Sequence, residues 1–201
     1  MSRISCVMLA TGKPSPISGQ NKLLLRFTQD TLVRRTALEV LNIPFEEVIV
    51  VTGRDSEEVA AEVKDLPLKV VHHSSFQIEP HTSLHIALSS LRKYQDGFFV
   101  CHGDHVEIDS DILNDMIRLF DMHEGKKIIC TDDHEKGSTP VLIPREFLPE
   151  LLQHEGDDDG YSYLLKKYLL RIAKVTAVQI SEPDYQNIAE AESLMMVAQH
   201  G

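Results

Sequence analysis

A loop rich in glycine, proline and serine occupies residues 11–22, directly after the apolar residues 5–10, and it ends in Lys22. Backbone N–H groups in such a loop can point at phosphate oxygens, while the lysine adds a point charge. The spacing matches neither the GxxxxGKS/T pattern nor the GxGxxG pattern. The loop is therefore equally consistent with a phosphate cradle and with a plain structural turn.

A carboxylate, Asp104, follows the apolar residues 98–101. A carboxylate gains nothing from apolar packing at the end of a buried strand. We therefore expect Asp104 to face a cleft or water. Oxygen ligands of this kind suit Mg²⁺, which keeps several waters and bridges to phosphates. The alternative interpretation is a turn aspartate that caps the next helix.

A second acidic group packs Asp157, Asp158 and Asp159 between Gly156 and Gly160. Asp157 or Asp159 could bind a metal ion or a substrate. An acidic turn that caps a helix over residues 161–168 explains the same letters equally well.

Histidines and cysteines gather near the predicted strands. Six of the ten histidines fall near strand ends: His72, His73, His81, His85, His102 and His105. The spacing of His81 and His85 can place both side chains on one metal ion, although an exposed helix face is the more frequent cause of such a pair. The three cysteines lie within apolar runs and are predicted to be reduced core residues. No GxSxG elbow is present, which disfavours a hydrolase.

Short apolar runs alternate with stretches of helical periodicity, which predicts a βαβ pattern. The predicted strands are residues 5–10, 48–52, 68–72, 98–102, 127–131, 140–143 and 175–180. The predicted helices are residues 31–41, 56–63, 83–91, 110–120 and 189–198. This alternation predicts a three-layer α/β fold with a doubly wound, mostly parallel sheet, in which ligands bind beyond the carboxyl ends of the strands.

Composition narrows the classes of partner. The formal net charge of −11 would repel a nucleic-acid backbone, so we expect no nucleic-acid partner, and a phosphorylated substrate would need local cations. The chain shows neither a signal-peptide core nor an apolar run long enough to span a membrane. We expect one cytoplasmic domain over residues 1–201, with no membrane partner; the sequence does not set the oligomeric state.

The residues VMLATG at 7–12, followed by Ser15, Gly19 and Lys22, resemble the LAAGxSxRMGxxK signature of the molybdopterin nucleotidyltransferase-like superfamily, which includes the MobA-like NTP transferases. Lys22 is followed by Leu-Leu-Leu, as in many cytidylyltransferases of this superfamily. The pattern as a whole is most similar to that of the molybdenum cofactor cytidylyltransferases. Further matching segments occur in the family's order, at residues 48–53, 71–84, 103–104, 139–142 and 187–194. The resemblance thus spans nearly the whole chain and implies a Rossmann-like nucleotidyltransferase fold.

The resemblance implies a Mg²⁺-dependent transfer of a nucleoside monophosphate from CTP or GTP to a phosphorylated, molybdopterin-type acceptor, with release of pyrophosphate. Lys22 and Asp104 would be the catalytic residues. The implied nucleotide-binding residues are Leu9, Ala10, Thr11, Gly12, Ser15, Lys22, His73 and Ser83. The implied Mg²⁺ ligands are Asp104 and, more weakly, Asn187 and Asp157.

One departure from the family pattern bears on activity. Ile17 and Ser18 stand where the family has Arg-Met, and that arginine helps the family to hold the triphosphate. This departure favours, as one alternative, a catalytically silent protein that still binds a nucleotide. A nucleotidyltransferase of the same fold that uses a sugar phosphate is the other alternative.

Overall fold

A seven-stranded sheet forms the centre of the protein in the computed structural model, with strand order β5-β4-β1-β6-β8-β7-β9. The structure describes residues 2–12, 19–27, 29–74, 80–92, 94–105, 108–131, 139–156 and 158–176. The strands are β1 (Ile4–Ala10), β4 (Val48–Thr52), β5 (Lys69–His72), β6 (Gly97–His102), β7 (Ile128–Thr131), β8 (Val141–Pro144) and β9 (Ile172–Val175). A separate two-stranded hairpin pairs β2 (Arg26–Phe27) with β3 (Asp30–Thr31).

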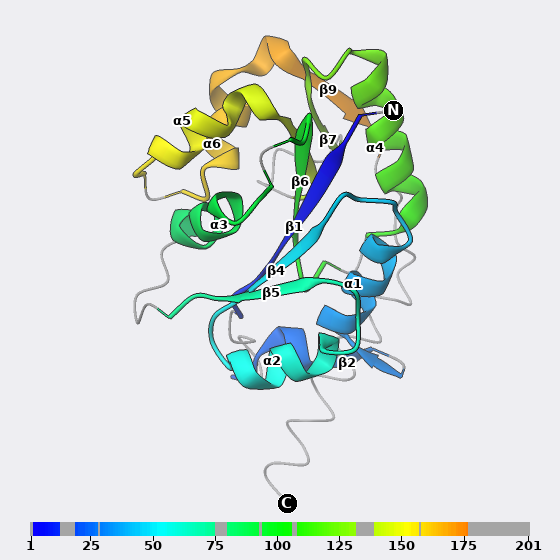
Figure 1. Ribbon diagram of the computed structural model, residues 1–201, viewed down its shortest axis with the longest axis vertical. Helices are drawn as coiled ribbons and strands as arrows, with labels where there is room; N and C mark the ends of the chain where they lie inside the picture. The colour runs from blue at the N-terminus through cyan, green and yellow to red at the C-terminus, as the bar shows by residue number, and fades with distance from the viewer. Residues whose placement is uncertain are drawn as a thin grey trace, which may run out of the picture.

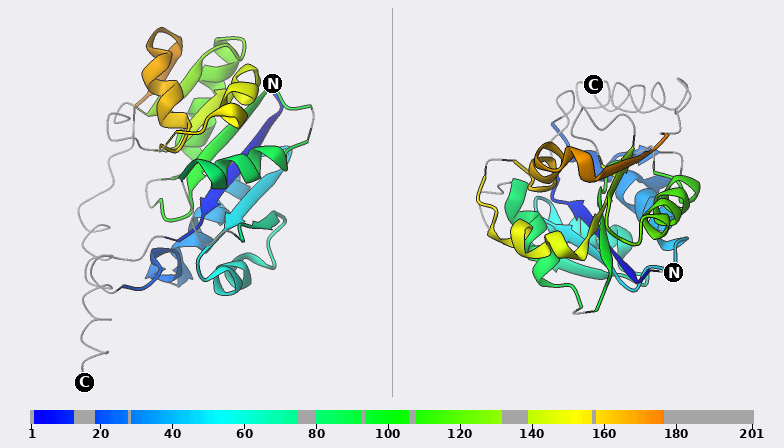
Figure 2. Two further views of the ribbon diagram at one scale, coloured as in Figure 1. Left: turned by 90° about the vertical axis from the view of Figure 1, so that its left-hand side faces the viewer. Right: turned by 90° about the horizontal axis from the view of Figure 1, so that it is seen from above.

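Helices cover both faces of the sheet, so the molecule has three layers (Figures 1 and 2). The helices are α1 (Leu32–Leu41), α2 (Ser56–Val63), α3 (Pro80–Ser89), α4 (Ser110–Met122), α5 (Leu148–Gln153) and α6 (Tyr161–Lys167). One apolar core joins the sheet to α1, α2 and α4, and a second joins it to α3, α5 and α6. The predicted doubly wound architecture is thereby confirmed.

The central strand β1 shows why the sequence builds two cores. Every residue of β1 is buried, and successive side chains of a strand point to opposite faces. Cys6 and Met8 accordingly pack in the core under α1 and α4, whereas Val7 and Leu9 pack in the core under α3. Both faces therefore require apolar residues, which is the pattern of a covered parallel sheet.

Strand β8 runs against the others. It pairs antiparallel with both β6 and β7, while β1, β4, β5 and β6 form one parallel series and β7 pairs parallel with β9. Because β8 is reversed, its first residues lie beside the last residues of β6. Thr139 and Pro140, which precede β8, therefore belong to the edge of the sheet where the parallel strands end.

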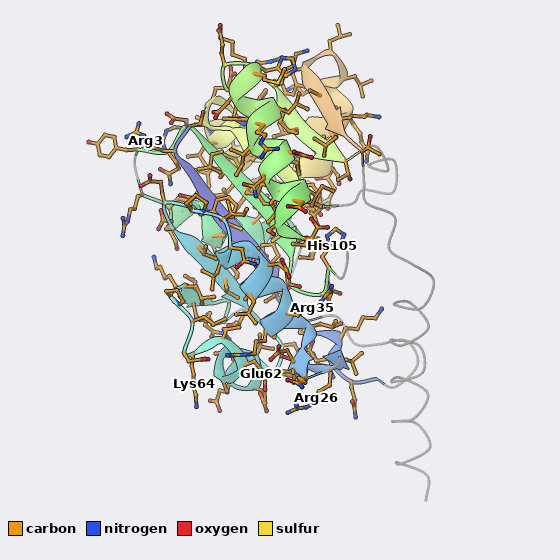
Figure 3. The ribbon with its side chains drawn as sticks, turned by 90° about the vertical axis from the view of Figure 1, so that its right-hand side faces the viewer. Arg3, Arg26, Arg35, Glu62, Lys64 and His105 are labelled. Atoms are coloured by element: carbon orange, nitrogen blue, oxygen red, sulfur yellow. The ribbon has the colours of Figure 1, made fainter. Side chains whose placement is uncertain are left out.

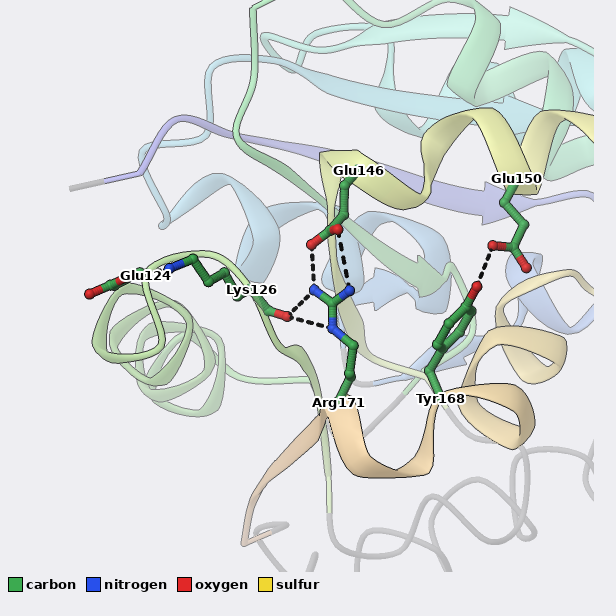
Figure 4. A network of polar contacts seen from close by, with 6 residues as sticks. All are labelled: Glu124, Lys126, Glu146, Glu150, Tyr168 and Arg171. Atoms are coloured by element: carbon green, nitrogen blue, oxygen red, sulfur yellow. Dashed lines mark hydrogen bonds and ion pairs between the residues drawn. The ribbon is translucent and has the colours of Figure 1, made fainter.

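The opposite edge of the sheet is held by polar contacts that we call the strand-start network: Arg3, Gln95, Asp96, Lys126, Arg145, Glu146 and Arg171. The backbone N–H of Arg3 donates to Asp96 at 2.7 Å, and Arg145 donates to the side-chain oxygen of Gln95 at 3.1 Å. Arg171 bonds both the Glu146 carboxylate and the Lys126 carbonyl (Figure 4). These contacts join the starts of β1, β6, β7 and β9 to the end of β8.

Most predicted elements agree with the observed ones to within three residues, and one strand is displaced. The last strand was predicted at residues 175–180, but β9 spans Ile172–Val175, because Ile172 and Ala173 pair with Ile128 and Ile129 of β7. Residues 177–180 and the predicted helix at 189–198 lie outside the described residues. The sequence did not predict α5 or the β2–β3 hairpin. Within the described ranges, no helix is long and apolar enough to cross a membrane.

Candidate active site

The loops after β1, β4 and β6 meet at the carboxyl edge of the sheet. β1 lies between β4 and β6, so the chain connections diverge on either side of it. Such a switch point leaves a crevice in which open α/β sheets bind their ligands. Leu9 and Ala10 end β1 as buried residues, and Thr11 and Gly12 follow as partly exposed ones. The four residues assigned to the phosphates therefore lie at this position.

Gly12 makes a turn that a larger residue would disturb. Its φ of +73° is in the left-handed region, which glycine adopts without steric cost. A Cβ atom at this position would lie 2.5 Å from Nδ2 of Asn21. The Arg54 N–H also donates to the Thr11 carbonyl at 3.0 Å, which joins the β1 loop to the β4 loop. The backbone at Thr11 and Gly12 is thus held against the β4 loop and packed against Asn21.

Asn21 is a buried residue that the sequence did not single out. Its Oδ1 accepts from the Leu23 N–H at 3.1 Å and caps the short helical turn η1 (Lys22–Leu24). Its Nδ2 donates to the Arg54 carbonyl at 3.3 Å. Asn21 thereby ties Lys22 to the loop after β4. The available signal was an asparagine directly before the lysine, since asparagine favours the position before a helical turn.

A close approach at Gly103 joins the segment that contains Lys22 to the segment that contains Asp104. The Gly103 N–H donates to the Leu9 carbonyl at 2.9 Å, and a Cβ atom on Gly103 would lie 2.9 Å from Leu23 Cδ2. Leu23 follows Lys22, and Gly103 precedes Asp104, so the two predicted catalytic residues flank this contact. Both Lys22 and Asp104 are partly exposed. The arrangement can therefore offer one cation and one carboxylate to a bound phosphate chain.

His73 and Ser83 form a buried polar pair beside β5. Nδ1 of His73 lies 3.3 Å from Oγ of Ser83, and the His73 N–H donates to the Thr52 carbonyl at 2.8 Å. The pKa of His73 is lowered, first by burial and then by the charge of His72. A neutral histidine and a hydroxyl can exchange hydrogen bonds with an uncharged group such as a base or a ribose.

A second polar pair joins β6 to α6. Nε2 of His102 lies 3.0 Å from the hydroxyl of Tyr161, whose ring is 1% exposed. Burial and the nearby Asp159 carboxylate raise the pKa of Tyr161, so the phenol keeps its proton.

Oδ1 of Asp159 accepts from the Ser162 N–H at 2.9 Å, which favours the helix-capping interpretation of this residue. Asp158 accepts from the Gly160 N–H and lies 2.7 Å from Nε2 of His154.

The structure gives His81 and His85 a packing role. Their rings meet edge to face at 5.4 Å, and Nε2 of His85 lies 2.6 Å from the Leu151 carbonyl on α5. In the part of the chain that the structure describes, no group of three or more histidines, cysteines or carboxylates could hold a metal ion. The cysteines Cys6, Cys101 and Cys130 are buried and form no disulfide bond, as predicted for reduced core residues.

Several residues of the predicted site lie outside the described residues. These residues are Ser15, Ile17, Ser18, Asp157 and Asn187. The described part of the site is therefore the backbone of Leu9–Gly12, the side chains of Asn21 and Lys22, the pair of His73 with Ser83, and Asp104.

The mostly parallel sheet with helices on both faces is the Rossmann-like fold of the nucleotidyltransferases. Residues 6–172 match the family described as the MobA-like NTP transferase domain, and the chain belongs to that family. A search of curated proteins returned no match to the sequence.

Solved structures share this fold at low sequence identity. A nucleotidyl transferase from Methanothermobacter superposes with a TM-score of 0.76 at 19% identity, over 98% of this chain and 99% of its own. The manganese complex of Rv0371c from Mycobacterium tuberculosis gives a TM-score of 0.71 at 20% identity, over 94% and 99%. A CMP:2-keto-3-deoxy-manno-octonic acid synthetase complexed with CTP gives 0.66 at 14% identity, over 100% of both chains. At these identities the similarity concerns the fold.

Proposed function

We propose that this protein transfers a nucleoside monophosphate from CTP or GTP to a phosphorylated acceptor of the molybdopterin type and releases pyrophosphate. The observation that supports the proposal is the close approach of Leu23 to Gly103, because Lys22 and Asp104 are the chain neighbours of these two residues. A lysine, a carboxylate and a turn of backbone N–H groups together suit a triphosphate. Membership in the MobA-like NTP transferase family supports the same reaction.

In the proposed reaction, an oxygen of the acceptor phosphate attacks the α-phosphorus of the triphosphate. A new P–O bond forms, the bond from the α-phosphorus to the bridging oxygen breaks, and pyrophosphate leaves with that electron pair. The protein supplies position and charge rather than covalent chemistry. The backbone at Leu9–Gly12 and the Lys22 ammonium would bind the phosphates, and His73 and Ser83 would bind the base or ribose.

A divalent cation fits this donor set. Mg²⁺ is characteristically bound by one or two carboxylates and completes its shell with phosphate oxygens and waters. Asp104 is a partly exposed carboxylate at the end of β6, so it could hold Mg²⁺ without a cluster of protein ligands. The ion would neutralise negative charge on the triphosphate. The manganese complex of Rv0371c is consistent with divalent metal use in this fold.

Two other functions are tested by the same experiment. Binding of CTP and GTP is measured by calorimetry with and without Mg²⁺, and pyrophosphate release is followed with molybdopterin or glucose 1-phosphate as acceptor. We expect Mg²⁺-dependent binding, and release that depends on molybdopterin. Binding without release would favour the silent nucleotide-binding protein, release with glucose 1-phosphate would favour the sugar-phosphate enzyme, and failure to bind either CTP or GTP would overturn the proposed function.

A further inference from the structure

A bound triphosphate carries more negative charge than Lys22 and an Mg²⁺ ion at Asp104 would neutralise. The chain carries a formal net charge of −11, and Asp104 adds a carboxylate at the same edge. A bound triphosphate is itself strongly negative, so it requires local cations. The loop of residues 11–22 contains no arginine, which raises the question of which side chain supplies the further charge.

Arg54 occupies a fixed position at this edge. It follows Gly53 in the loop after β4, and its backbone joins the two segments that form the phosphate turn. Its N–H donates to the Thr11 carbonyl at 3.0 Å, and its carbonyl accepts from Nδ2 of Asn21 at 3.3 Å. The Cα atom of Arg54 is thereby fixed beside Gly12 and the start of η1.

In the described part of the chain, the side chain of Arg54 makes only a long, exposed ion pair with Asp55. Its Nε lies 3.6 Å from Oδ2 of Asp55, and the two side chains are 50% and 38% exposed. This distance is too long for a hydrogen bond, and exposed ion pairs of this kind contribute little. The guanidinium can therefore leave Asp55 for a more strongly charged partner at small cost.

Other arginines near this edge are already engaged. Arg34 forms a bidentate pair with Asp65, at 2.7 and 2.8 Å, and also donates to the Glu62 carbonyl. Arg26 donates to the Gln29 carbonyl inside the β2–β3 hairpin. Figure 3, which views the molecule from the side of α1 and α4, shows Arg26 and Glu62 at the end where α2 lies. These guanidinium groups hold the scaffold together.

We infer that Arg54 binds the phosphate chain of the nucleoside triphosphate and supplies the arginine contact that the β1 loop lacks. The inference rests on the proposed function. The planar guanidinium donates two parallel hydrogen bonds to phosphate oxygens, a geometry that lysine cannot reproduce. With Lys22 on the other side of the Gly12 turn, the phosphates would lie between two cations that are anchored through Asn21.

The test compares Arg54→Gln, Arg54→Lys and the matched control Arg118→Gln. Arg118 is also an exposed arginine paired with an aspartate, but it lies on α4. Calorimetry with Mg²⁺ and CTP, GTP or CMP should show that Arg54→Gln weakens triphosphate binding at least about tenfold, the effect of losing a charge-assisted hydrogen bond. Arg54→Lys should fall between Arg54→Gln and wild type. CMP binding, the Arg118→Gln affinities and all three melting temperatures should remain close to wild type.

Asp55→Asn provides a test of opposite sign. Asparagine tolerates the left-handed backbone of this position, where φ is +52°, and the change removes the carboxylate that competes for Arg54. We expect Asp55→Asn to strengthen CTP binding, and expect this gain to vanish in the double variant with Arg54→Gln. Two results would overturn the inference and leave the proposed function standing. Arg54→Gln could bind CTP with wild-type affinity, or it could lose affinity for CMP and CTP equally. A wild-type protein that binds neither CTP nor GTP would overturn the proposed function, and the inference with it.

Discussion

Lys22 is positioned through its chain neighbours Asn21 and Leu23. Asn21 caps the turn in which Lys22 lies, and Leu23 packs in the core against Gly103. The backbone of η1 is therefore anchored on both sides of the lysine, while the lysine side chain is partly exposed. A cation held in this way can bind a ligand without contributing to folding.

Replacement of Lys22 by alanine should separate binding from stability. We expect Lys22→Ala to weaken triphosphate binding by about 1.5–3 kcal/mol, the range for a hydrogen bond to a charged group. The melting temperature should stay nearly unchanged, because Asn21 and Leu23 still anchor the turn. Calorimetry and thermal unfolding of the same sample check both statements, and unaltered affinity or an unfolded variant would contradict them.

Asp104 should be responsible for the Mg²⁺ dependence of nucleotide binding. Removing the carboxylate in Asp104→Ala takes away the described oxygen ligand that we assign to the ion. Wild-type affinity for CTP or GTP should rise when Mg²⁺ is added, whereas the affinity of the variant should not. Calorimetry with and without Mg²⁺ measures the difference. The same Mg²⁺-linked gain in both proteins would mean that the ion is held elsewhere.

At the scale of elements, the contact between η1 and β6 sets the spacing of Lys22 and Asp104. Gly103→Ala would place a Cβ atom 2.9 Å from Leu23 and 3.3 Å from Ala10. We expect a loss of about 1–3 kcal/mol in the free energy of unfolding, as for other overpacked cores, together with weaker nucleotide binding. Denaturant unfolding and calorimetry provide the two measurements.

A second substitution tests the cause of that loss. Leu23→Val shortens the side chain that the new methyl group meets, so the double variant should recover much of the binding lost in Gly103→Ala. If Leu23→Val adds its own loss without any recovery, the distance between η1 and β6 is not what Gly103 controls.

The elements that could be predicted from sequence are those with apolar runs of their own. β4 and α2 begin and end at the predicted residues. Val48–Thr52 is an apolar run, and Ser56–Val63 follows a turn and has a helical pattern of its own. β9 could not be placed, since Ile172–Val175 includes Lys174 and is defined by its pairing with β7. The apolar residues that follow it gave a stronger local signal than the strand itself.

The site was predictable in part for the same reason. Lys22 and Asp104 end or follow recognisable segments, so a motif and a strand pattern pointed to them. Asn21 and Arg54 matter through contacts between separate loops, and no local pattern reports such contacts. The pairing of His102 with Tyr161 likewise joins residues far apart in the chain. The roles of all the site residues remain predictions, and Ser15, Asp157 and Asn187 also lie outside the described residues.

At the scale of the whole molecule, the buried His73 should make stability depend on pH. Burial lowers its pKa below the ordinary value of 6.5, so the unfolded chain binds this proton more readily than the folded one. The contribution of His73 is present above about pH 6.5 and is lost as the pH falls through the lowered pKa. Acid should therefore destabilise the wild-type protein through this residue.

His73→Gln isolates this contribution from the other nine histidines. Thermal unfolding of both proteins is measured between about pH 8 and about pH 5, the range in which histidine titrates. The melting temperature of the wild type, relative to that of the variant, should fall as the pH is lowered. A constant difference across this range would show that His73 titrates alike in the folded and unfolded chains.

The strand-start network lies at the opposite end of the sheet from the candidate site. Arg3, Gln95 and Arg171 hold the first residues of their strands, whereas the proposed substrate contacts come from the loops after the strands. Sequence change in those loops therefore does not disturb the contacts that secure the sheet. For an engineer, other loop positions at the carboxyl edge can consequently be varied in a search for new acceptors, with Arg54, Gly103, Asp104 and the strand-start network left unchanged.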